Sequence, residues 1–105
     1  GGIKVPLMMH WPAGIEANSQ YDELVQNIDY TPTFLELAGV NLKEVKTKLD
    51  GVSLKNVLKG SSTAVHDYLY FELGFAKGVA TKDWKYITVR YDNQTQKKNR
   101  KRDIV

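Results

Sequence analysis

The sequence predicts an α/β region followed by a small antiparallel sheet with a helix, an α+β arrangement, and three observations lead to this fold class. An early segment, VPLMM, is apolar at every position, as in a strand that is covered on both faces. Two later segments have the spacing and the end signals of helices. The last third alternates between apolar and polar residues, which is typical of strands. We therefore divide the chain into residues 1–60 and 61–105.

The apolar segment from Val5 to Met9 is the first predicted strand. Pro6 cannot donate a backbone hydrogen bond, which places it at the start of the strand or on a sheet edge. Pro12 and Gly14 follow and end the segment. A strand of this kind needs layers above and below it, and exposed apolar edges invite pairing with another chain. We expect this segment to be covered by further protein or to mediate self-association.

The first predicted helix lies in NIDYTPTFLELAG. Asp29 or Thr31 can cap it, and Pro32 fits its first turn, where a missing N–H costs nothing. Gly39 sits where a left-handed residue would end the helix. The expected apolar face consists of Phe34, Leu35, Leu37 and Ala38.

A second, shorter helix is predicted in DGVSLKNVLKG. Asp50 and Gly51 form a turn, Ser53 is the expected N-cap, and Gly60 is the stop. The apolar residues recur with the spacing i, i+3, i+4 of one helix face, at Leu54, Val57 and Leu58. This pattern indicates a short surface helix.

The strands are predicted from period-two patterning after residue 66. In DYLYFEL, Leu69, Phe71 and Leu73 share one face, and the tyrosines and Glu72 share the other. GVATKDWKYITVRY is interpreted as two strands joined by a turn at Lys82 and Asp83. Three antiparallel strands are therefore expected.

Composition excludes several classes of site within these residues. No apolar run approaches the ~20 residues that cross a bilayer, so we expect no membrane partner. The net charge of +3 depends on KKNRKR at residues 97–102, and the remainder is slightly acidic, which argues against a nucleic-acid surface. There is no cysteine for a disulfide, a zinc site or a thiol nucleophile. His10 and His66 lack triad partners, and Asp92 with Asn93 indicates a turn, so we predict no catalytic residue and no metal ligand.

Four blocks in order, GGIKVPLMMHWPAGI, DELVQNIDYTPTFLELAG, DGVSLKNVLKG and LYFELGFAKGVATKDWKYI, resemble the C-terminal part of a formylglycine-dependent sulfatase of the alkaline-phosphatase superfamily. The resemblance extends to about Tyr91. It implies that residues 1–60 are the C-terminal edge of the large alkaline-phosphatase-like sandwich. Residues 61–105 would then be the small C-terminal subdomain with its basic polar tail.

The resemblance also implies the chemistry of the whole enzyme. In this family a formylglycine attacks sulfur while calcium and basic residues stabilise the sulfate oxygens, because the transition state gathers negative charge there. Calcium and formylglycine are thus expected in the parent enzyme, with none in this chain. The implied partners are the N-terminal sulfatase domain and a sulfated small molecule or glycan. The implied location is periplasmic or secreted.

Two residues are candidate substrate contacts through the resemblance. Many relatives carry an Arg-Ala-Val-Arg pattern on the strand that faces the cleft, and here that stretch is KGVA from Lys77 to Ala80. The first basic position is kept and the second is lost. Glu72 and Lys77 would then lie near the sulfated substrate, although a structural salt bridge explains the pair equally well.

Two alternatives remain open from the sequence. The chain could be a small non-catalytic module whose aromatic sheet and basic tail bind an anionic glycan or nucleic acid. It could also be part of a related phosphodiesterase, because the strand and helix blocks extend beyond sulfatases. The residues upstream of Gly1 would discriminate among them, since a Cys-x-Pro-Ser-Arg motif belongs to sulfatases.

Overall fold

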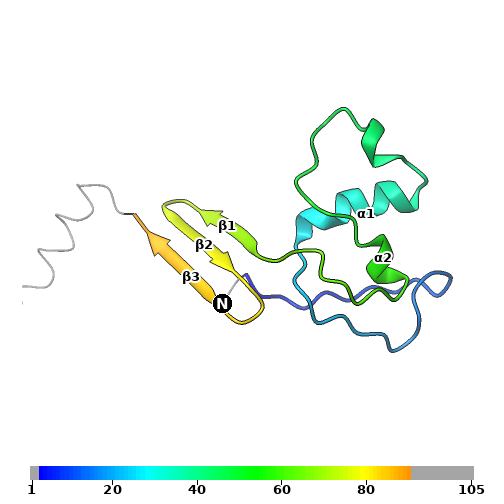
Figure 1. Ribbon diagram of the computed structural model, residues 1–105, viewed down its shortest axis with the longest axis horizontal. Coiled ribbons are helices and arrows are strands. Elements are labelled where there is room, and N and C mark those ends of the chain that lie inside the picture. The colour runs from blue at the N-terminus through cyan, green and yellow to red at the C-terminus, as the bar shows by residue number, and fades with distance from the viewer. Residues whose placement is uncertain (1–2, 91–105) are drawn as a thin grey trace, which may run out of the picture. The chain divides into compact units, whose positions relative to one another are not determined.

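The computed structural model describes residues 3–90, and the chain divides into two compact units, Gly1–Val65 and His66–Val105 (Figure 1). The helical segments of the first unit are η1 (Asn27–Asp29), α1 (Tyr30–Leu37), η2 (Leu42–Glu44) and α2 (Lys55–Leu58). The strands of the second unit are β1 (Leu69–Leu73), β2 (Ala76–Ala80) and β3 (Lys85–Val89). Within residues 3–90, no helix has the length and apolar character that crossing a membrane requires.

Residues 5–9, which the sequence predicts as a buried strand, form no strand in the structure. Val5 is 73% exposed and Met8 is 88% exposed. The sheet of the described residues contains β1, β2 and β3 alone, so this segment has no paired neighbour there. A strand covered on both faces depends on neighbouring strands and on two covering layers. The predicted strand is therefore wrong for these residues, and self-association through them stays a prediction.

The predicted helix at residues 29–39 is confirmed as η1 followed by α1. Gly39 ends it with a φ of +87°, a conformation that glycine adopts without steric cost. The predicted apolar face is wrong at Phe34, which is 60% exposed, whereas Pro32 and Thr33 are the buried residues of α1. The buried face of α1 therefore includes a polar side chain, that of Thr33.

A hydrogen-bonded clasp joins η1 and α1 to the loop at residues 51–54, and we call it the Asp29–Thr33 clasp. The Val52 N–H donates to Asp29 Oδ1 at 2.8 Å, and the Leu54 N–H donates to Thr33 Oγ1 at 2.8 Å. The Thr33 hydroxyl in turn donates to the Asp29 carbonyl at 2.6 Å. Both polar side chains are fully buried, so their hydrogen bonds offset the cost of removing them from water.

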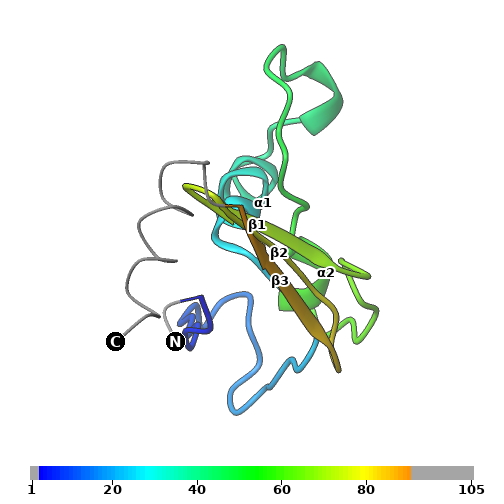
Figure 2. The same cartoon turned by 90° about the vertical axis from the view of Figure 1, so that its left-hand side faces the viewer.

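Gly51 lets the loop approach this closely. A Cβ at Gly51 would collide with the backbone carbonyl of Ile28, so only a residue without a side chain fits. Leu54, 2% exposed, packs beneath the clasp. Figure 2 shows the segment that carries η2 extending away from α1.

The second predicted helix is confirmed as the single turn of α2. The N-cap is Leu54, so the predicted N-cap, Ser53, is one residue too early, although its hydroxyl still accepts from the Lys55 N–H at 3.2 Å. Gly60 follows with a φ of +95° and stops the helix as expected. An ion pair between Lys55 Nζ and Glu36 Oε1, 3.6 Å apart, links α2 to α1.

The three predicted strands are confirmed as an antiparallel sheet in the order β1-β2-β3. A two-residue turn joins β1 to β2, with Leu73 opposite Ala76. Its first residue, Gly74, has a φ of +57°, as the first central position of a type II′ hairpin requires. The turn at Lys82 and Asp83 joins β2 to β3 as predicted, and the Thr81 N–H donates across it to the Trp84 carbonyl at 2.8 Å.

One face of the sheet is apolar except for Lys85 on β3, and it is packed around a glycine. Phe71 lies over Gly78, because a Cβ built on Gly78 would overlap the Phe71 ring. Gly78 is consequently the buried residue of β2. Cross-strand partners share a face, so the register assigns the same face to Leu69, Phe71, Leu73, Ile87 and Val89.

Candidate functional site

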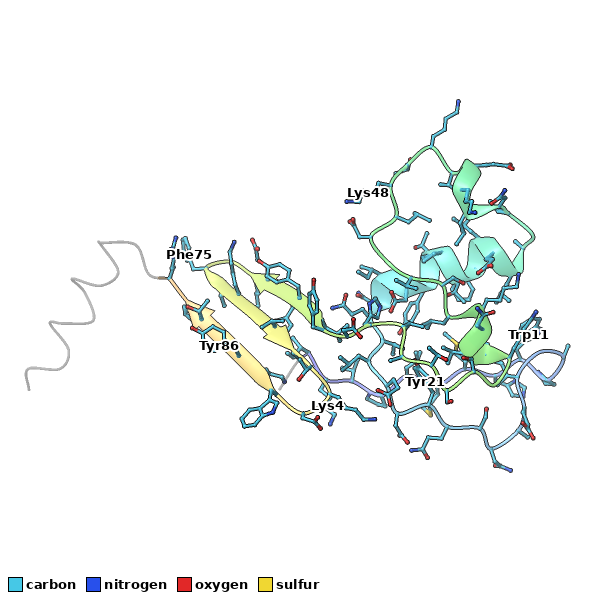
Figure 3. The ribbon with its side chains drawn as sticks, in the orientation of Figure 1. Lys4, Trp11, Tyr21, Lys48, Phe75 and Tyr86 are labelled. Carbon is cyan, nitrogen blue, oxygen red and sulfur yellow. The ribbon has the colours of Figure 1, made fainter. Side chains whose placement is uncertain are left out.

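The opposite face of the sheet carries polar and aromatic side chains in two cross-strand rows. In the first row, Tyr70 of β1 pairs with Val79 of β2, which pairs with Tyr86 of β3. In the second row, two positions along, the partners are Glu72, Lys77 and Thr88. Because side chains alternate between faces, both rows project from the same face. Figure 3 shows Tyr86 on β3 and Phe75 at the β1–β2 turn.

Glu72 and Lys77, the two predicted substrate contacts, are brought together by this register. They are direct cross-strand partners, and Lys77 Nζ lies 3.4 Å from Glu72 Oε2. The Tyr70 hydroxyl donates to the same Glu72 oxygen at 2.7 Å. The side chains of Lys77 and Glu72 are 57% and 50% exposed, so the pair is open to a ligand. Whether they contact substrate stays a prediction.

The three side chains of this cluster shift one another's pKa. The hydrogen bond from Tyr70, followed by the interaction with Lys77, lowers the pKa of Glu72 below its ordinary value. Glu72 in turn raises the pKa of Lys77 and of Tyr70. At neutral pH the cluster therefore consists of a carboxylate, an ammonium and a neutral phenol.

This arrangement can bind a polar ligand. An ammonium has three donor hydrogens, and Glu72 contacts that of Lys77 through a single carboxylate oxygen, Oε2. The remaining donors can meet an anionic oxygen, and the carboxylate can accept from hydroxyl groups. We interpret the cluster as a recognition surface.

Sequence reasoning missed Tyr70 as the partner of Glu72. The signal was present, because residues i and i+2 of a strand share a face and Tyr70 precedes Glu72 by two positions. What the sequence did not provide was the choice between Tyr70 and other neighbours. The structure identifies the hydroxyl of Tyr70 as the donor that fixes the carboxylate.

The described residues do not fit a metal or formylglycine centre. In residues 3–90, no group of three or more His, Cys, Asp or Glu side chains is placed to hold a metal ion. The chain contains no cysteine. His10 is exposed and His66 is half-buried. Asp92, Asn93 and the basic run at residues 97–102 lie outside the described residues.

The first unit has a concave feature of its own. An open hollow of about 520 Å³ is lined by residues 11–16 and Lys59. Trp11, labelled in Figure 3, packs so closely on Gly14 that a Cβ there would overlap the indole. The Gly14 and Ile15 N–H groups both donate to the Trp11 carbonyl, at 2.9 and 2.8 Å. This turn explains the packing of Trp11, and its side chains do not form a polar cluster like that on the sheet.

Comparison with known proteins gives a family match across the chain. A family model for the C-terminal region of N-sulphoglucosamine sulphohydrolase matches residues 1–103. The match includes both units and all three strands of the sheet.

Individual relatives agree with this match. The chain is 48% identical over 60 residues to N-acetylglucosamine-6-sulfatase of Homo sapiens, covering 57% of this chain and 10% of that protein. It is 33% identical over 96 residues to N-acetylglucosamine-6-O-sulfatase of Bacteroides thetaiotaomicron, covering 80% of this chain and 17% of that protein. It is 36% identical over 97 residues to choline-sulfatase of Rhizobium meliloti, covering 88% of this chain and 18% of that protein. The chain thus spans less than a fifth of the length of these relatives.

Proposed function

This chain belongs to the family defined by the C-terminal region of N-sulphoglucosamine sulphohydrolase, and on that premise we propose that it is the C-terminal portion of an enzyme that hydrolyses sulfate esters. The observation that carries the proposal is the family match over residues 1–103. The three relatives described above are all sulfatases, which supports the same reaction. The substrate would be an aryl or carbohydrate sulfate.

Within that enzyme the chain would provide scaffold and part of the substrate rim. Residues 1–60 would form the edge of an alkaline-phosphatase-like sandwich, and residues 61–105 the small C-terminal subdomain. The exposed side chains at Val5 and Met8 support this assignment, because a further layer of protein would remove them from water. The N-terminal sulfatase domain is the proposed source of that layer.

The catalytic centre would lie outside this chain. Calcium and formylglycine are proposed for the whole enzyme, and residues 3–90 offer no group of side chains placed to hold a metal ion. When bound there, they would supply a Lewis acid and a nucleophile for sulfate ester hydrolysis. A periplasmic or secreted location is part of the same proposal.

Lys77 is the residue of this chain that we propose as a sulfate contact, with Glu72 holding it in place. Its ammonium is exposed, has donors to spare and is oriented by a carboxylate. A sulfate oxygen could replace or share that contact without moving the backbone. The pair would therefore form one side of the substrate rim.

The test is Lys77→Met in the full protein, with turnover measured on a carbohydrate sulfate. Methionine keeps an unbranched side chain, one atom shorter than that of lysine, and removes its charge. We expect KM to rise roughly fivefold with kcat nearly unchanged, as for one charge-assisted hydrogen bond at an exposed site. Lys85→Met is the matched control, because Lys85 lies on β3 and its partner Ala80 belongs to the apolar face. Equal effects of the two variants would contradict the assignment of Lys77.

A related phosphodiesterase is the competing function for the whole protein. Hydrolysis of a phosphate diester at a rate that exceeds hydrolysis of the matching sulfate ester would favour it. The same assay thus tests the reaction class and, through the two lysine variants, the substrate contact.

A further inference from the structure

The polar face of the sheet combines two features that the proposed function uses only in part. Its second row carries the Glu72–Lys77 pair, and its first row carries Tyr70 and Tyr86 with Val79 between them. We propose that this face is a saccharide platform, on which the tyrosine rings stack against sugar rings while Lys77 contacts a sulfate group. This deepens the proposed function, on which it rests, by naming a sulfated glycan as the ligand.

The two tyrosines of the first row are exposed on the same face of the sheet. Tyr70 is 53% exposed and Tyr86 is 67% exposed, so both rings are open to solvent. They are separated by two strand spacings, or roughly 10 Å. The faces of a pyranose ring carry C–H groups that pack on an aromatic ring, while its hydroxyls remain at the edges. Two rings at this spacing can each contact one sugar of a short chain.

The polar row is ordered before any ligand arrives. The Tyr70 hydroxyl donates to Glu72 at 2.7 Å, and Glu72 holds Lys77 at 3.4 Å. One tyrosine therefore belongs to both rows, through its ring and through its hydroxyl. Such preorganisation lowers the entropy that a ligand loses on binding. The carboxylate can accept from sugar hydroxyls on the side that faces solvent.

Charge favours a sparsely sulfated saccharide over a nucleic acid. Nucleotide bases can also stack on tyrosine, but each nucleotide adds a phosphate that needs a cation. On this face the charge of Lys77 is balanced by the carboxylate of Glu72. A protein segment fits less well, because covering the ion pair with apolar side chains would desolvate both charges. A sugar presents hydroxyl groups to this pair and leaves it hydrated.

The test uses the full protein and the variant Tyr86→Thr, which removes the ring and keeps a residue that favours strands. Phe75→Thr is the matched control, because Phe75 is an aromatic residue of similar exposure, 65%, at the hairpin turn. Binding of a desulfated hexosamine tetrasaccharide is measured by calorimetry. KM is measured for the sulfated tetrasaccharide and for nitrophenyl sulfate.

We expect Tyr86→Thr to weaken binding of the desulfated tetrasaccharide about tenfold, as for loss of one stacked ring. KM for the sulfated tetrasaccharide should rise by a similar factor, while KM for nitrophenyl sulfate stays constant. Phe75→Thr should change none of these values. Tyr86→Phe, which keeps the ring, should bind like the unmodified protein.

The outcomes separate the two proposals. Absence of sulfate ester hydrolysis would overturn the proposed function, and calorimetry with the desulfated ligand would still test the platform. Unchanged saccharide binding in Tyr86→Thr, with circular dichroism matching the unmodified protein, would overturn the platform. An equal loss in Phe75→Thr would overturn it as well. If Tyr86→Thr fails to fold, Tyr70→Phe provides the second test, because it should leave stacking intact and alter the KM of the sulfated ligand alone.

Discussion

Polar side chains have opposite roles in the two units of the chain. In the helical unit, the most deeply buried groups include the polar side chains of Asp29 and Thr33, which bind the backbone of a distant loop. In the sheet, the polar side chains of Glu72 and Lys77 are about half exposed. The comparison teaches that polar groups serve stability where they are buried and saturated, and remain available for recognition where they are exposed and only partly engaged.

The largest effect is expected from breaking the Asp29–Thr33 clasp. Asp29→Ala removes the acceptor of the Gln26 and Val52 N–H groups, at 2.7 and 2.8 Å, so two part-buried hydrogen bonds are lost. We expect a loss of about 2–5 kcal/mol in local stability, since a donor that loses its acceptor at a site shielded from water costs about 1–3 kcal/mol. Amide hydrogen exchange at Val52 and Leu54 measures it.

Asp22→Ala is the control for that experiment, because Asp22 is exposed and bonds only within its own loop, to Gln20 at 2.6 Å. It should change exchange at Val52 little. Exchange that is equally slow in Asp29→Ala and in the unmodified protein would show that the loop is held by packing at Leu54 instead. The contrast between the two units would then disappear.

An intermediate effect is expected at the apolar face of the sheet. Gly78→Ala places a methyl group where the Phe71 ring lies, so the ring must move. We expect a loss of about 1–3 kcal/mol, as for other overpacked sites. A double-mutant cycle with Phe71→Ala checks the cause, because the alanine at Gly78 should cost much less once the ring is gone. Additive losses would contradict close packing between these two residues.

The smallest effect is expected from Tyr70→Phe, which tests the exposed polar cluster of the sheet. Loss of the hydroxyl should move the pKa of Glu72 upward, toward its ordinary value, with Lys77 still holding it below. Because the folded pKa is depressed, the stabilisation by Glu72 is present above the unfolded pKa and is lost as pH falls through the folded value. A carboxyl titration followed by NMR in both proteins checks the direction.

Local signals in the sequence predicted the element ends well. Gly39 and Gly60 stop their helices with positive φ, and the turn at Lys82 and Asp83 joins two strands. These features depend on a few neighbouring residues, so a single sequence contains them. Asp29 was predicted only as a cap, because its bond to Val52 joins residues 23 positions apart. Contacts over that distance depend on the folded path of the chain.

The candidate site was predicted in part. The resemblance selected Glu72 and Lys77, and period-two patterning placed Glu72 with the tyrosines, but the cross-strand register that pairs it with Lys77 required the structure. The prediction of a strand at residues 5–9 was wrong for a physical reason. A short apolar run becomes a strand only when other strands pair with it, and residues 3–90 offer it none.

The two-residue turn at Gly74 has an evolutionary consequence. The turn sets which residue of β2 faces Glu72, and side chains alternate with a period of two. An insertion of one codon beside Gly74 would therefore shift the pairing and present a neighbour of Lys77 in its place. Two inserted codons could preserve the alternation. Under the role proposed for Glu72 and Lys77, relatives that change this hairpin are thus expected to vary its length in even steps, or to exchange side chains at fixed length.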